Sequence, residues 1–600
     1  MVELLIHNMA PIMFGALVVL LLLGYPVAFA LAFNGLLFGV IGIELGLFAP
    51  NFLQALPERV YGIMNNDTLL AIPFFTFMGL ILERSGMAED LLDTVGQLFG
   101  PVRGGLAYAV IFVGALLAAT TGVVAASVIS MGLISLPIML RYGYDRRLAT
   151  GVIAASGTLA QIIPPSLVLI VMADQLGRSV GDMYEGAIIP GLVLTGLYAG
   201  YVLLISILFP KAAPALPPEA LTIREDNGSH GITSFCVLLA LTAVVAYLAH
   251  FWLAGRVVQG EAIFAVSIAV AFAYVAALVD YYLGLGLLSR MAAQVVFVLV
   301  PPLALIFLVL GTIFVGIATP TEGGAMGASG ALILAVAKRR LSFDLLKQAM
   351  DSTAKLSAFV IFILIGARVF SLTFYGVNGH KWVEELLVGL PGGETGFLIF
   401  VNVLVFFLAF FLDFFELAFI IVPLLGPAAE RLGIDLIWFG VILGVNMQTS
   451  FMHPPFGFSL FYLRSVAPRV PYLDKVTGKR MEPVTTGQIY WGSVPFVCIQ
   501  VVMIGLVILF PQMVMHYKGA GTGVDPNSIQ NFDIPGIDLA PPAGLEGLGG
   551  PPADLAPPSG LAPPADLAPP PGLAPPADLA PPPGLAPPPG LAPPPPQGQQ

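Results

Sequence analysis

The sequence predicts an all-α polytopic membrane protein with two structural repeats and a disordered C-terminal tail. Its composition is strongly apolar: 57% of the residues are hydrophobic and 10% are charged, where soluble domains carry about 25% charged residues. Many segments reach the roughly 20 apolar residues that a helical membrane span requires. A Pro-Pro pair also interrupts one apolar segment in each half, at 164–165 and at 454–455. The matched pair indicates a duplication.

The apolar segments set the order of the expected helices, and polar or Gly/Pro-rich residues separate them. The first segment is interrupted near Pro26. In the first half the expected helices cover 10–45, 66–84, 104–119, 121–140, 147–175 and 185–209. Two more follow at 231–254 and 260–288, and the second half supplies 291–316, 318–337, 355–376, 396–411, 413–429, 434–463 and 486–512.

Two helix pairs are joined by connections too short for ordinary loops. The segments 104–119 and 121–140 meet at Thr120-Thr121-Gly122, and the segments 396–411 and 413–429 meet at Leu412-Asp413. Each pair lies at the same distance before a Pro-Pro interruption. We therefore expect re-entrant hairpins whose tips stop inside the membrane. Two ordinary spans with a tight loop are the alternative.

An offset of 290 residues relates the two halves. It places Pro137 on Pro427, Gly143 on Gly433, Asp145 on Asp435, Ser156 on Asn446 and the two Pro-Pro pairs on each other. The ordered series favours duplication over chance. Interrupted helices at corresponding positions of two repeats are the strongest sequence pointer to a transporter binding site. Hydropathy alone does not decide whether the repeats are inverted or parallel.

Four regions follow from this organisation. Residues 1–209 form the first repeat, 210–290 a linker with additional scaffold helices, and 291–517 the second repeat. Residues 518–600 are a tail of hexapeptides such as Asp554-Leu-Ala-Pro-Pro-Ser559, with no Lys or Arg after Lys518. Such low-complexity sequence favours polyproline II and cannot bury a core. We expect a passive extended tail, with docking of a partner that has an aromatic groove as the alternative.

The broken helices carry the main candidate site. Ending a helix inside the membrane leaves carbonyl groups free on one side of the break and N–H groups on the other. The carbonyl end suits a hard cation such as Na⁺, and the N–H end suits a carboxylate. The polar residues beside the breaks are Ser156, Gly157, Thr158, Asn446, Gln448, Thr449 and Ser450. The alternative is that they only cap the freed backbone.

The hairpin tips supply further candidates. Thr120, Thr121 and Gly122 offer hydroxyl groups and flexible backbone at one tip, and Asp413 lies at the other with Glu416 one turn later. Carboxylates inside a membrane are costly and point to function. Asp413 would stabilise a cation, carry a proton or cap a helix N-terminus.

Four residues are candidates for the substrate: Thr319, Thr321, Gln448 and Arg368. Arg368 stands alone in an apolar helix and would pair with a substrate carboxylate; snorkelling, or pairing with Asp413 or Glu416, is equally compatible. Thr321 and Glu322 would instead cap the helix that follows Pro320. His453, beside Pro454, is a proton-relay candidate, although hydrogen bonding at the helix end is the simpler interpretation.

Several classes of function are excluded by missing motifs. The sequence has no Walker loop, no nucleophile motif, no His/Cys cluster with metal spacing and no basic patch for nucleic acid. We expect no enzyme activity and no cofactor. Basic loops at 141–147, 338–347 and 475–480 should face the cytoplasm, because Lys and Arg are enriched there.

In these motifs the chain resembles the large membrane subunit of TRAP (tripartite ATP-independent periplasmic) transporters. The resemblance spans about residues 5–515. The last of the motifs is closest to the branch labelled mannitol/chloroaromatic-type. The matching segments are Gly24–Ala30, Gly157-Thr158 through Pro164-Pro165-Ser166, Ala318–Glu322, and Asn446 through Pro454-Pro455-Phe456-Gly457.

The resemblance implies a Na⁺-coupled importer of an organic acid in the bacterial inner membrane. A periplasmic binding protein would deliver the substrate, and a small four-helix membrane subunit would brace the large one. The implied fold has inverted repeats and a domain that moves like an elevator. Na⁺ sites would lie between 120–122 and 156–158, and between 412–413 and 446–450. The long region 210–288 and the repeat tail depart from the family pattern.

Overall fold

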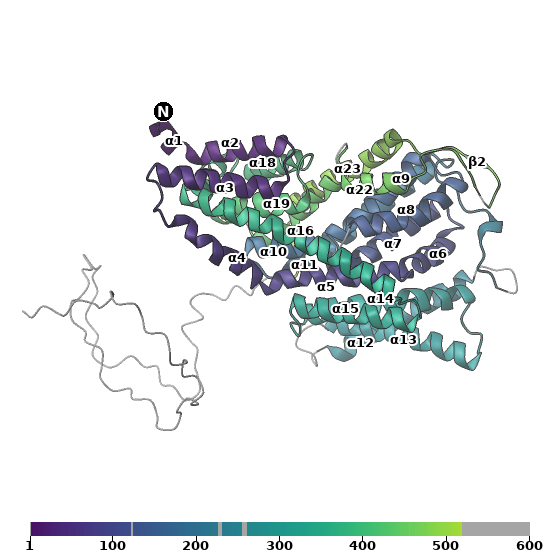
Figure 1. Cartoon of the computed structure of the whole chain (residues 1–600). Helices are drawn as coiled ribbons and strands as arrows, with labels where there is room; N and C mark the ends of the chain where they lie inside the picture. The colour runs from purple at the N-terminus through teal and green to yellow at the C-terminus, as the bar shows by residue number, and fades with distance from the viewer. Residues whose placement is uncertain are drawn as a thin grey trace, which may run out of the picture. The chain divides into compact units, whose positions relative to one another are not determined.

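The chain is mostly helical in the part that its computed structural model describes, which comprises residues 2–121, 124–225, 231–254, 261–454, 457–474 and 476–518 (Figure 1). The predicted tail beyond Lys518 lies outside these residues. Within them, eight helices are long and apolar enough to span a bilayer, and two bent helix pairs would raise the number to ten. The prediction of an all-α polytopic membrane protein is confirmed.

The first repeat begins after a short helix, α1 (Val2–His7), and alternates long helices with short connections. Its helices are α2 (Met9–Leu22), α3 (Val27–Glu44), α4 (Leu56–Met64), α5 (Asp67–Arg84), α6 (Met87–Phe99), α7 (Gly105–Thr121), α8 (Val124–Arg141), α9 (Arg146–Thr158), α10 (Leu167–Leu176) and α11 (Val180–Leu208). Pro26 precedes α3 as its N-cap residue. The predicted interruption therefore separates α2 from α3.

Two further helices, α12 (Ile232–Leu253) and α13 (Glu261–Leu283), occupy the long region between the repeats. They pack against each other and against α14 (Arg290–Phe314), which in turn packs on α15 (Pro320–Ala337). Figure 1 shows these four helices side by side. Only a small share of α12 is buried, and most of the rest is apolar surface that suits lipid.

The second repeat repeats the order of the first. Its helices after α14 and α15 are α16 (Phe343–Gly376), α17 (Gly379–Val388), α18 (Gly393–Leu408), α19 (Phe414–Ile420), α20 (Val422–Arg431), α21 (Leu436–Met447), α22 (Phe458–Val466), α23 (Thr486–Leu509) and α24 (Gln512–Met515). A two-stranded antiparallel hairpin, β1 (Tyr472–Leu473) with β2 (Arg480–Met481), follows α22.

The local structure bears out the offset of 290. Asp145 and Asp435 cap α9 and α21 in the same way: each carboxylate accepts from two backbone N–H groups, at 2.9 and 3.1 Å. The glycines two residues earlier, Gly143 and Gly433, both have a left-handed backbone, with φ of 83° and 78°. Equivalent residues therefore turn each hairpin into the following broken helix.

Two ion pairs show that the repeats are inverted. Arg141, at the end of the first hairpin, pairs at 3.0 Å with Asp474 in the loop after the second broken helix. Glu430, at the end of the second hairpin, pairs at 3.0 Å with Arg178 after the first broken helix. Each hairpin thus ends where the broken helix of the other repeat ends. The two ends of a broken helix lie on opposite sides of the membrane. The two hairpins therefore open toward opposite sides, as inverted repeats require.

Two further pairs of helices, each with one member from either repeat, show the same reciprocal arrangement. α3 of the first repeat packs along α16 of the second, and α15 of the second packs along α5 of the first. The α3–α16 approach is close, because a Cβ on Gly35 would lie 2.6 Å from the carbonyl oxygen of Val369. We call α2–α5 and α14–α16 the outer helices, and α7–α10 and α18–α22 the inner helices.

Hydropathy alone misplaced or missed several elements. The predicted helix 355–376 begins at Phe343 instead, because Ser342 caps it and its first turns carry polar residues outside the apolar segment. The helices α4, α6 and α17 were not predicted. Their apolar residues lie on one face only, so none of them forms a continuous apolar segment.

Candidate substrate and cation site

Both broken helices change to a short 3₁₀ turn before their prolines. In the first, α9 ends at Thr158 and the turn Leu159–Gln161 precedes Pro164-Pro165. α10 then starts after Ser166, whose hydroxyl donates to the Gln161 carbonyl at 2.5 Å and accepts from Leu169 N–H. A serine N-cap satisfies freed backbone on both sides of the break.

The second break repeats this arrangement. α21 ends at Met447, and the turn Gln448–Phe451 leads to Pro454; Pro455 lies outside the described residues. α22 resumes at Phe458. The Ser459 hydroxyl donates to the Phe451 carbonyl at 2.7 Å. In both repeats a serine hydroxyl thus satisfies a carbonyl that the break exposes.

The two breaks meet directly. The Gln448 side-chain amide donates to the Thr158 hydroxyl at 3.0 Å, and both residues are fully buried. Since 158 and 448 differ by the repeat offset of 290, the pseudo-two-fold axis passes between these side chains. The two breaks therefore share one polar centre.

The hydroxyl groups at the breaks are used in one common way. Each donates to a backbone carbonyl three or four residues earlier, at 2.7 or 2.8 Å, from Ser156, Thr158, Thr449 and Ser450. This bonding satisfies their hydrogens and leaves oxygen lone pairs available. The geometry thus accommodates both interpretations given above, capping of backbone and coordination of a cation.

Four amide oxygens at the centre have no hydrogen-bond donor among the described residues: Gln161 Oε1, Asn446 Oδ1, Gln448 Oε1 and Gln500 Oε1. The amide nitrogen of Asn446 donates to the backbone and side-chain oxygens of Asn402, both at 2.8 Å. Buried polar atoms are normally paired. A cluster of buried oxygens without donors is therefore suited to a cation.

A cavity of about 260 Å³ adjoins this centre. Inner helices of both repeats line it, with Gln161 from the first break and Asp413 from the second hairpin as its main polar groups. α16 closes its outer side with Leu356 and Phe359. The cavity therefore lies on the seam between inner and outer helices.

The first hairpin tip is described only in part. α7 continues through Thr121, Gly122 lies outside the described residues, and the side chains of Thr120 and Thr121 are not placed. The two helices of this hairpin, α7 and α8, pack tightly on the first break. A Cβ on Gly157 would lie 2.3 Å from Val128 Cγ2, and a Cβ on Gly114 would lie 2.6 Å from Ser156 Cβ. These glycines permit the close approach.

Asp413 caps the half-helix α19. Its carboxylate accepts from Glu416 N–H, and the Glu416 carboxylate accepts from Asp413 N–H, both at 2.9 Å. This reciprocal capping box matches the capping alternative for Asp413. Because Asp413 also lines the cavity, capping does not remove it from the site.

The structure does not place Thr319 and Thr321 at this cavity. Thr319 caps α15 in a second capping box with Glu322, and the Thr321 hydroxyl donates to the Asp67 carbonyl at 2.6 Å. Both lie where α15 begins beside α5. Glu322 caps this helix as the capping interpretation expects, but its partner is Thr319 and not Thr321. Their role as substrate ligands stays a prediction without geometric support.

Arg368 lies away from the polar centre, whereas the backbone N–H of His453 donates to the Thr449 carbonyl within the second break. No ion pair joins Arg368 to Asp413 or Glu416 within the described residues; Arg368 lines a separate cavity with Arg59. His453 is buried against aromatic rings, stacked on Phe410 with centroids 4.1 Å apart. Its surroundings are those of a packed ring rather than of a proton relay.

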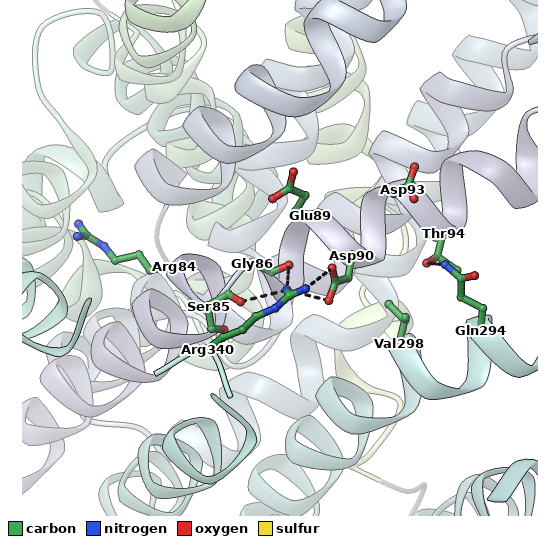
Figure 2. Close-up of a pocket in the computed structure, with 10 residues that line it drawn as sticks. All are labelled: Arg84, Ser85, Gly86, Glu89, Asp90, Asp93, Thr94, Gln294, Val298 and Arg340. Carbon is green, nitrogen blue, oxygen red and sulfur yellow. Dashed lines mark hydrogen bonds and ion pairs between the residues drawn. The ribbon is translucent and has the colours of Figure 1, made fainter. Parts of the chain in front are cut away.

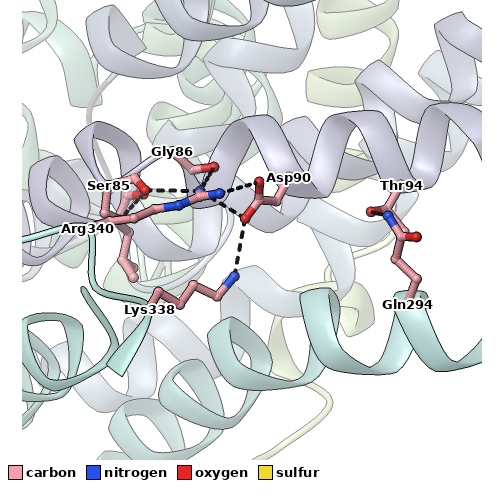
Figure 3. A network of polar contacts seen from close by, with 8 residues as sticks. Ser85, Gly86, Asp90, Thr94, Gln294, Lys338 and Arg340 are labelled. Carbon is pink, nitrogen blue, oxygen red and sulfur yellow. Dashed lines mark hydrogen bonds and ion pairs between the residues drawn. The ribbon is translucent and has the colours of Figure 1, made fainter. Parts of the chain in front are cut away.

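The cavity with the largest volume among those described, about 820 Å³, lies beside α6 (Figure 2). Arg340, which follows α15, donates to Asp90 on α6 and to the Ser85 and Gly86 carbonyls at the end of α5. Figure 3 shows Lys338 reaching the same carboxylate. We call these contacts the Arg340 clasp, and they fix the angle between α5 and α6.

Sequence reasoning missed two residues at the centre and left a third out of the candidates. Asn402 in α18 binds Asn446, and Gln500 in α23 donates to the Tyr198 hydroxyl at 2.9 Å beside Met452. Both are polar residues in apolar helices, a signal that would have identified them. Gln161 lies within the first broken segment, but it is not among the site residues that the sequence predicts.

Inverted repeats whose interrupted helices meet at a pseudo-two-fold axis define the class of secondary-transporter permeases. The sequence model described as "Tripartite ATP-independent periplasmic transporter, DctM component" matches residues 14–513. The chain therefore belongs to the DctM family of TRAP transporter large permeases. It is a multi-pass permease of the bacterial inner membrane and not an enzyme.

Curated relatives carry the names of permeases for different solutes. The C4-dicarboxylate TRAP transporter large permease protein DctM of Pseudomonas aeruginosa is 28% identical, covering 70% of this chain and 82% of its own. The ectoine TRAP transporter large permease protein TeaC of Halomonas elongata is 24% identical, covering 85% and 99%. The isethionate TRAP transporter permease protein DctMQ of Oleidesulfovibrio alaskensis is 25% identical, covering 78% and 62%.

Proposed function

We propose that this permease imports an organic acid by Na⁺ symport, together with a periplasmic binding protein and a small four-helix membrane subunit. The observation that carries the coupling ion is the set of buried amide oxygens without donors at Gln161, Asn446 and Gln448. Uncharged oxygen ligands suit Na⁺ because they bind it without leaving a permanent charge in the membrane when it departs. The hydroxyl oxygens of Thr158, Thr449 and Ser450 add acceptors beside them.

The proposed substrate class, an organic acid, is supported by the electrostatics of two helix N-termini and by the names of the relatives. The backbone N–H groups at the start of α10 and α22 face the break region and favour an anion. Relatives named for C4-dicarboxylates and isethionate handle acids. The cavity of about 260 Å³ suits a small molecule. A small carboxylate seated between Gln161 and the Asp413 tip, beside bound Na⁺, fits these observations.

Elevator-type alternating access is supported by the seam on which this cavity lies. Its inner wall comes from the hairpins and broken helices, whereas its outer wall is the single long helix α16. In each repeat an amphipathic helix, α6 or α17, joins an outer helix to a hairpin. These two helices would act as arms along which the inner helices move relative to the outer ones.

The test is uptake into proteoliposomes that contain the permease, its small subunit and its binding protein. We expect uptake of the binding protein's ligand to require an inward Na⁺ gradient and to fall at least tenfold when K⁺ replaces Na⁺. Equal uptake in Na⁺ and K⁺ would refute the coupling. A channel would instead pass solute without the binding protein, and a scaffold or receptor would show no uptake.

A further inference from the structure

Two adjoining cavities lie farther along the same seam, toward the end of the molecule that holds Arg178. Their volumes are about 300 Å³ and 620 Å³, and both are lined by Arg59 of α4 together with Leu364 and Arg368 of α16. Inner helices supply the opposite wall of the smaller cavity, through Gln175 of α10 and Phe419 of α19.

The charge of the smaller cavity is unbalanced. Neither guanidinium makes a hydrogen bond or ion pair with another described residue. Gln175, Ser371 and Tyr375 are the other polar groups of this cavity, and none is acidic; Glu58 lines only the larger one. Unpaired guanidinium groups in a partly enclosed cavity attract carboxylates, which they bind through two parallel hydrogen bonds.

The position along α16 links this cavity to the central one. Leu364, Arg368, Ser371 and Tyr375 recur at spacings of three and four residues and therefore share one face of α16, whereas Leu356 and Phe359, which line the central cavity, lie on another side of the same helix. Phe359 lines the central cavity and Arg368 the smaller outer one. Nine residues separate them, which is about 14 Å at 1.5 Å per residue.

We propose that Arg59 and Arg368 form a second carboxylate site, the outer site, on the outer helices. The outer site binds the substrate before movement of the inner helices brings the central cavity beside it. The proposal rests on the function proposed above and adds to it a second binding position with its ligand chemistry. A shift of the inner helices along α16 by about the separation of the two cavities, combined with a rotation about that helix, would bring Gln161 and Asp413 beside the arginines. The carboxylate then passes from guanidinium to the break region without crossing the apolar stretch of α16.

The site can be tested without a known substrate by arginine footprinting. The full-length permease in nanodiscs is treated with phenylglyoxal, and modification of each arginine is followed by mass spectrometry. Succinate is the anionic probe, succinamide is its uncharged match, and NaCl of equal ionic strength controls for screening. Arg431, paired with Glu384 at 2.8 Å and absent from both cavities, is the internal control.

We expect succinate to slow modification of Arg59 and Arg368 at least fivefold, with no effect of succinamide and no change at Arg431. Equal rates with and without succinate, or equal protection by NaCl, would overturn the outer site. Footprinting needs neither the binding protein nor a Na⁺ gradient. A permease that shows protection but no Na⁺-driven uptake would therefore contradict the coupling alone.

Discussion

At the scale of single residues, the centre of the molecule is made by side chains that repeat at an interval of 290. Thr158 and Gln448 bond across the pseudo-two-fold axis, although neither carries a charge. Small residues determine how closely the hairpins approach them. The site therefore depends on neutral oxygen atoms held in place by tight packing, and both features can be tested by substitution.

The oxygen atoms should control the response to Na⁺. In Thr158→Ala and Asn446→Ala we expect the Na⁺ concentration for half-maximal uptake to rise about tenfold, which corresponds to about 1.4 kcal/mol of binding free energy. Na⁺ titration of uptake measures it. Ser206→Ala removes a hydroxyl that bonds only its own helix α11 and should leave the titration unchanged. An unaltered Na⁺ requirement in both site variants would refute the assignment.

Packing at the first break should be intolerant of one added methyl group. Gly157→Ala places a Cβ against Val128 and should lower the free energy of unfolding by about 1–3 kcal/mol, measured by thermal unfolding in nanodiscs. Val128→Ala in the same chain should restore most of the loss. Gly196→Ala in α11, where a Cβ meets nothing within 4 Å, is the control. Equal unfolding midpoints for Gly157→Ala and this control would contradict the close approach.

Much of the residue-level geometry followed from the sequence, because prolines and glycines act locally. The Pro-Pro breaks and the Asp413 cap depend on neighbours a few residues away. Asp145 and Asp435 were matched by the repeat offset, but their capping role was not predicted. The partners Asn402 and Gln500 did not follow, because each reaches the centre from another helix. Arg59 was missed for the same reason: it faces Arg368 only through the packing of α4 beside α16.

At the scale of elements, the arms α6 and α17 are held differently. The Arg340 clasp ties α6 to the outer helices (Figure 3), whereas α17 is tied to α20 of the inner helices through Glu384 and Arg431. The clasp is an ionic contact between α6 and the outer helices, and α6 also packs on α7 and α8 of the first hairpin.

Breaking the clasp should loosen the first arm. Arg340→Gln removes a half-exposed ion pair worth about 0.2–1 kcal/mol, so amide hydrogen exchange in the first turns of α6 should quicken by up to about fivefold. Arg178→Gln breaks a comparable exposed pair elsewhere and should leave α6 unchanged. Unaltered exchange in α6 of the Arg340 variant would show that the clasp does not hold the arm.

The ion pair between Arg141 and Asp474, which indicates the inversion, is stabilised by further polar contacts in its loop. Hydrogen bonds from Thr477, together with Arg141, hold the pKa of Asp474 below its usual range. A carboxyl group whose pKa is lower in the folded than in the unfolded protein stabilises the folded state at pH values above its unfolded-state pKa. This stabilisation is lost as the pH falls through the folded-state pKa. The basic loops predicted to lie on one side, 141–147 and 475–480, are joined by this pair; Lys475 itself lies outside the described residues.

Hydropathy indicated the long apolar helices but not the arms, for a physical reason. An amphipathic helix at a membrane surface has the average composition of a loop, and its periodicity appears only when it is sought. The order of hairpin and broken helix was predictable because turn residues mark it. The direction of the second repeat relative to the first was not, because it depends on contacts between residues hundreds of positions apart.

At the scale of the whole molecule, three binding features lie on one seam. The polar centre and its cavity lie at the pseudo-axis, and the Arg59–Arg368 cavity lies about 14 Å away along α16. The helices α12 and α13, which fill the long region between the repeats, both pack on α14 of the outer helices. We therefore expect the inner helices to move along α16 during transport while the outer helices stay together.

Cross-linking across this seam tests that expectation most directly. Phe359 on α16 and Phe415 on α19 are in contact, with ring centroids 6.3 Å apart. Both would be replaced by cysteine in a background with Cys236→Ser and Cys498→Ser, and joined by a short reducible thiol reagent. Tyr247→Cys with Phe251→Cys, whose native rings lie 4.8 Å apart within α12, is the control. We predict that the 359–415 cross-link lowers uptake at least tenfold and that reduction restores it, with the control unaffected; uptake at the uncross-linked rate would contradict movement along the seam.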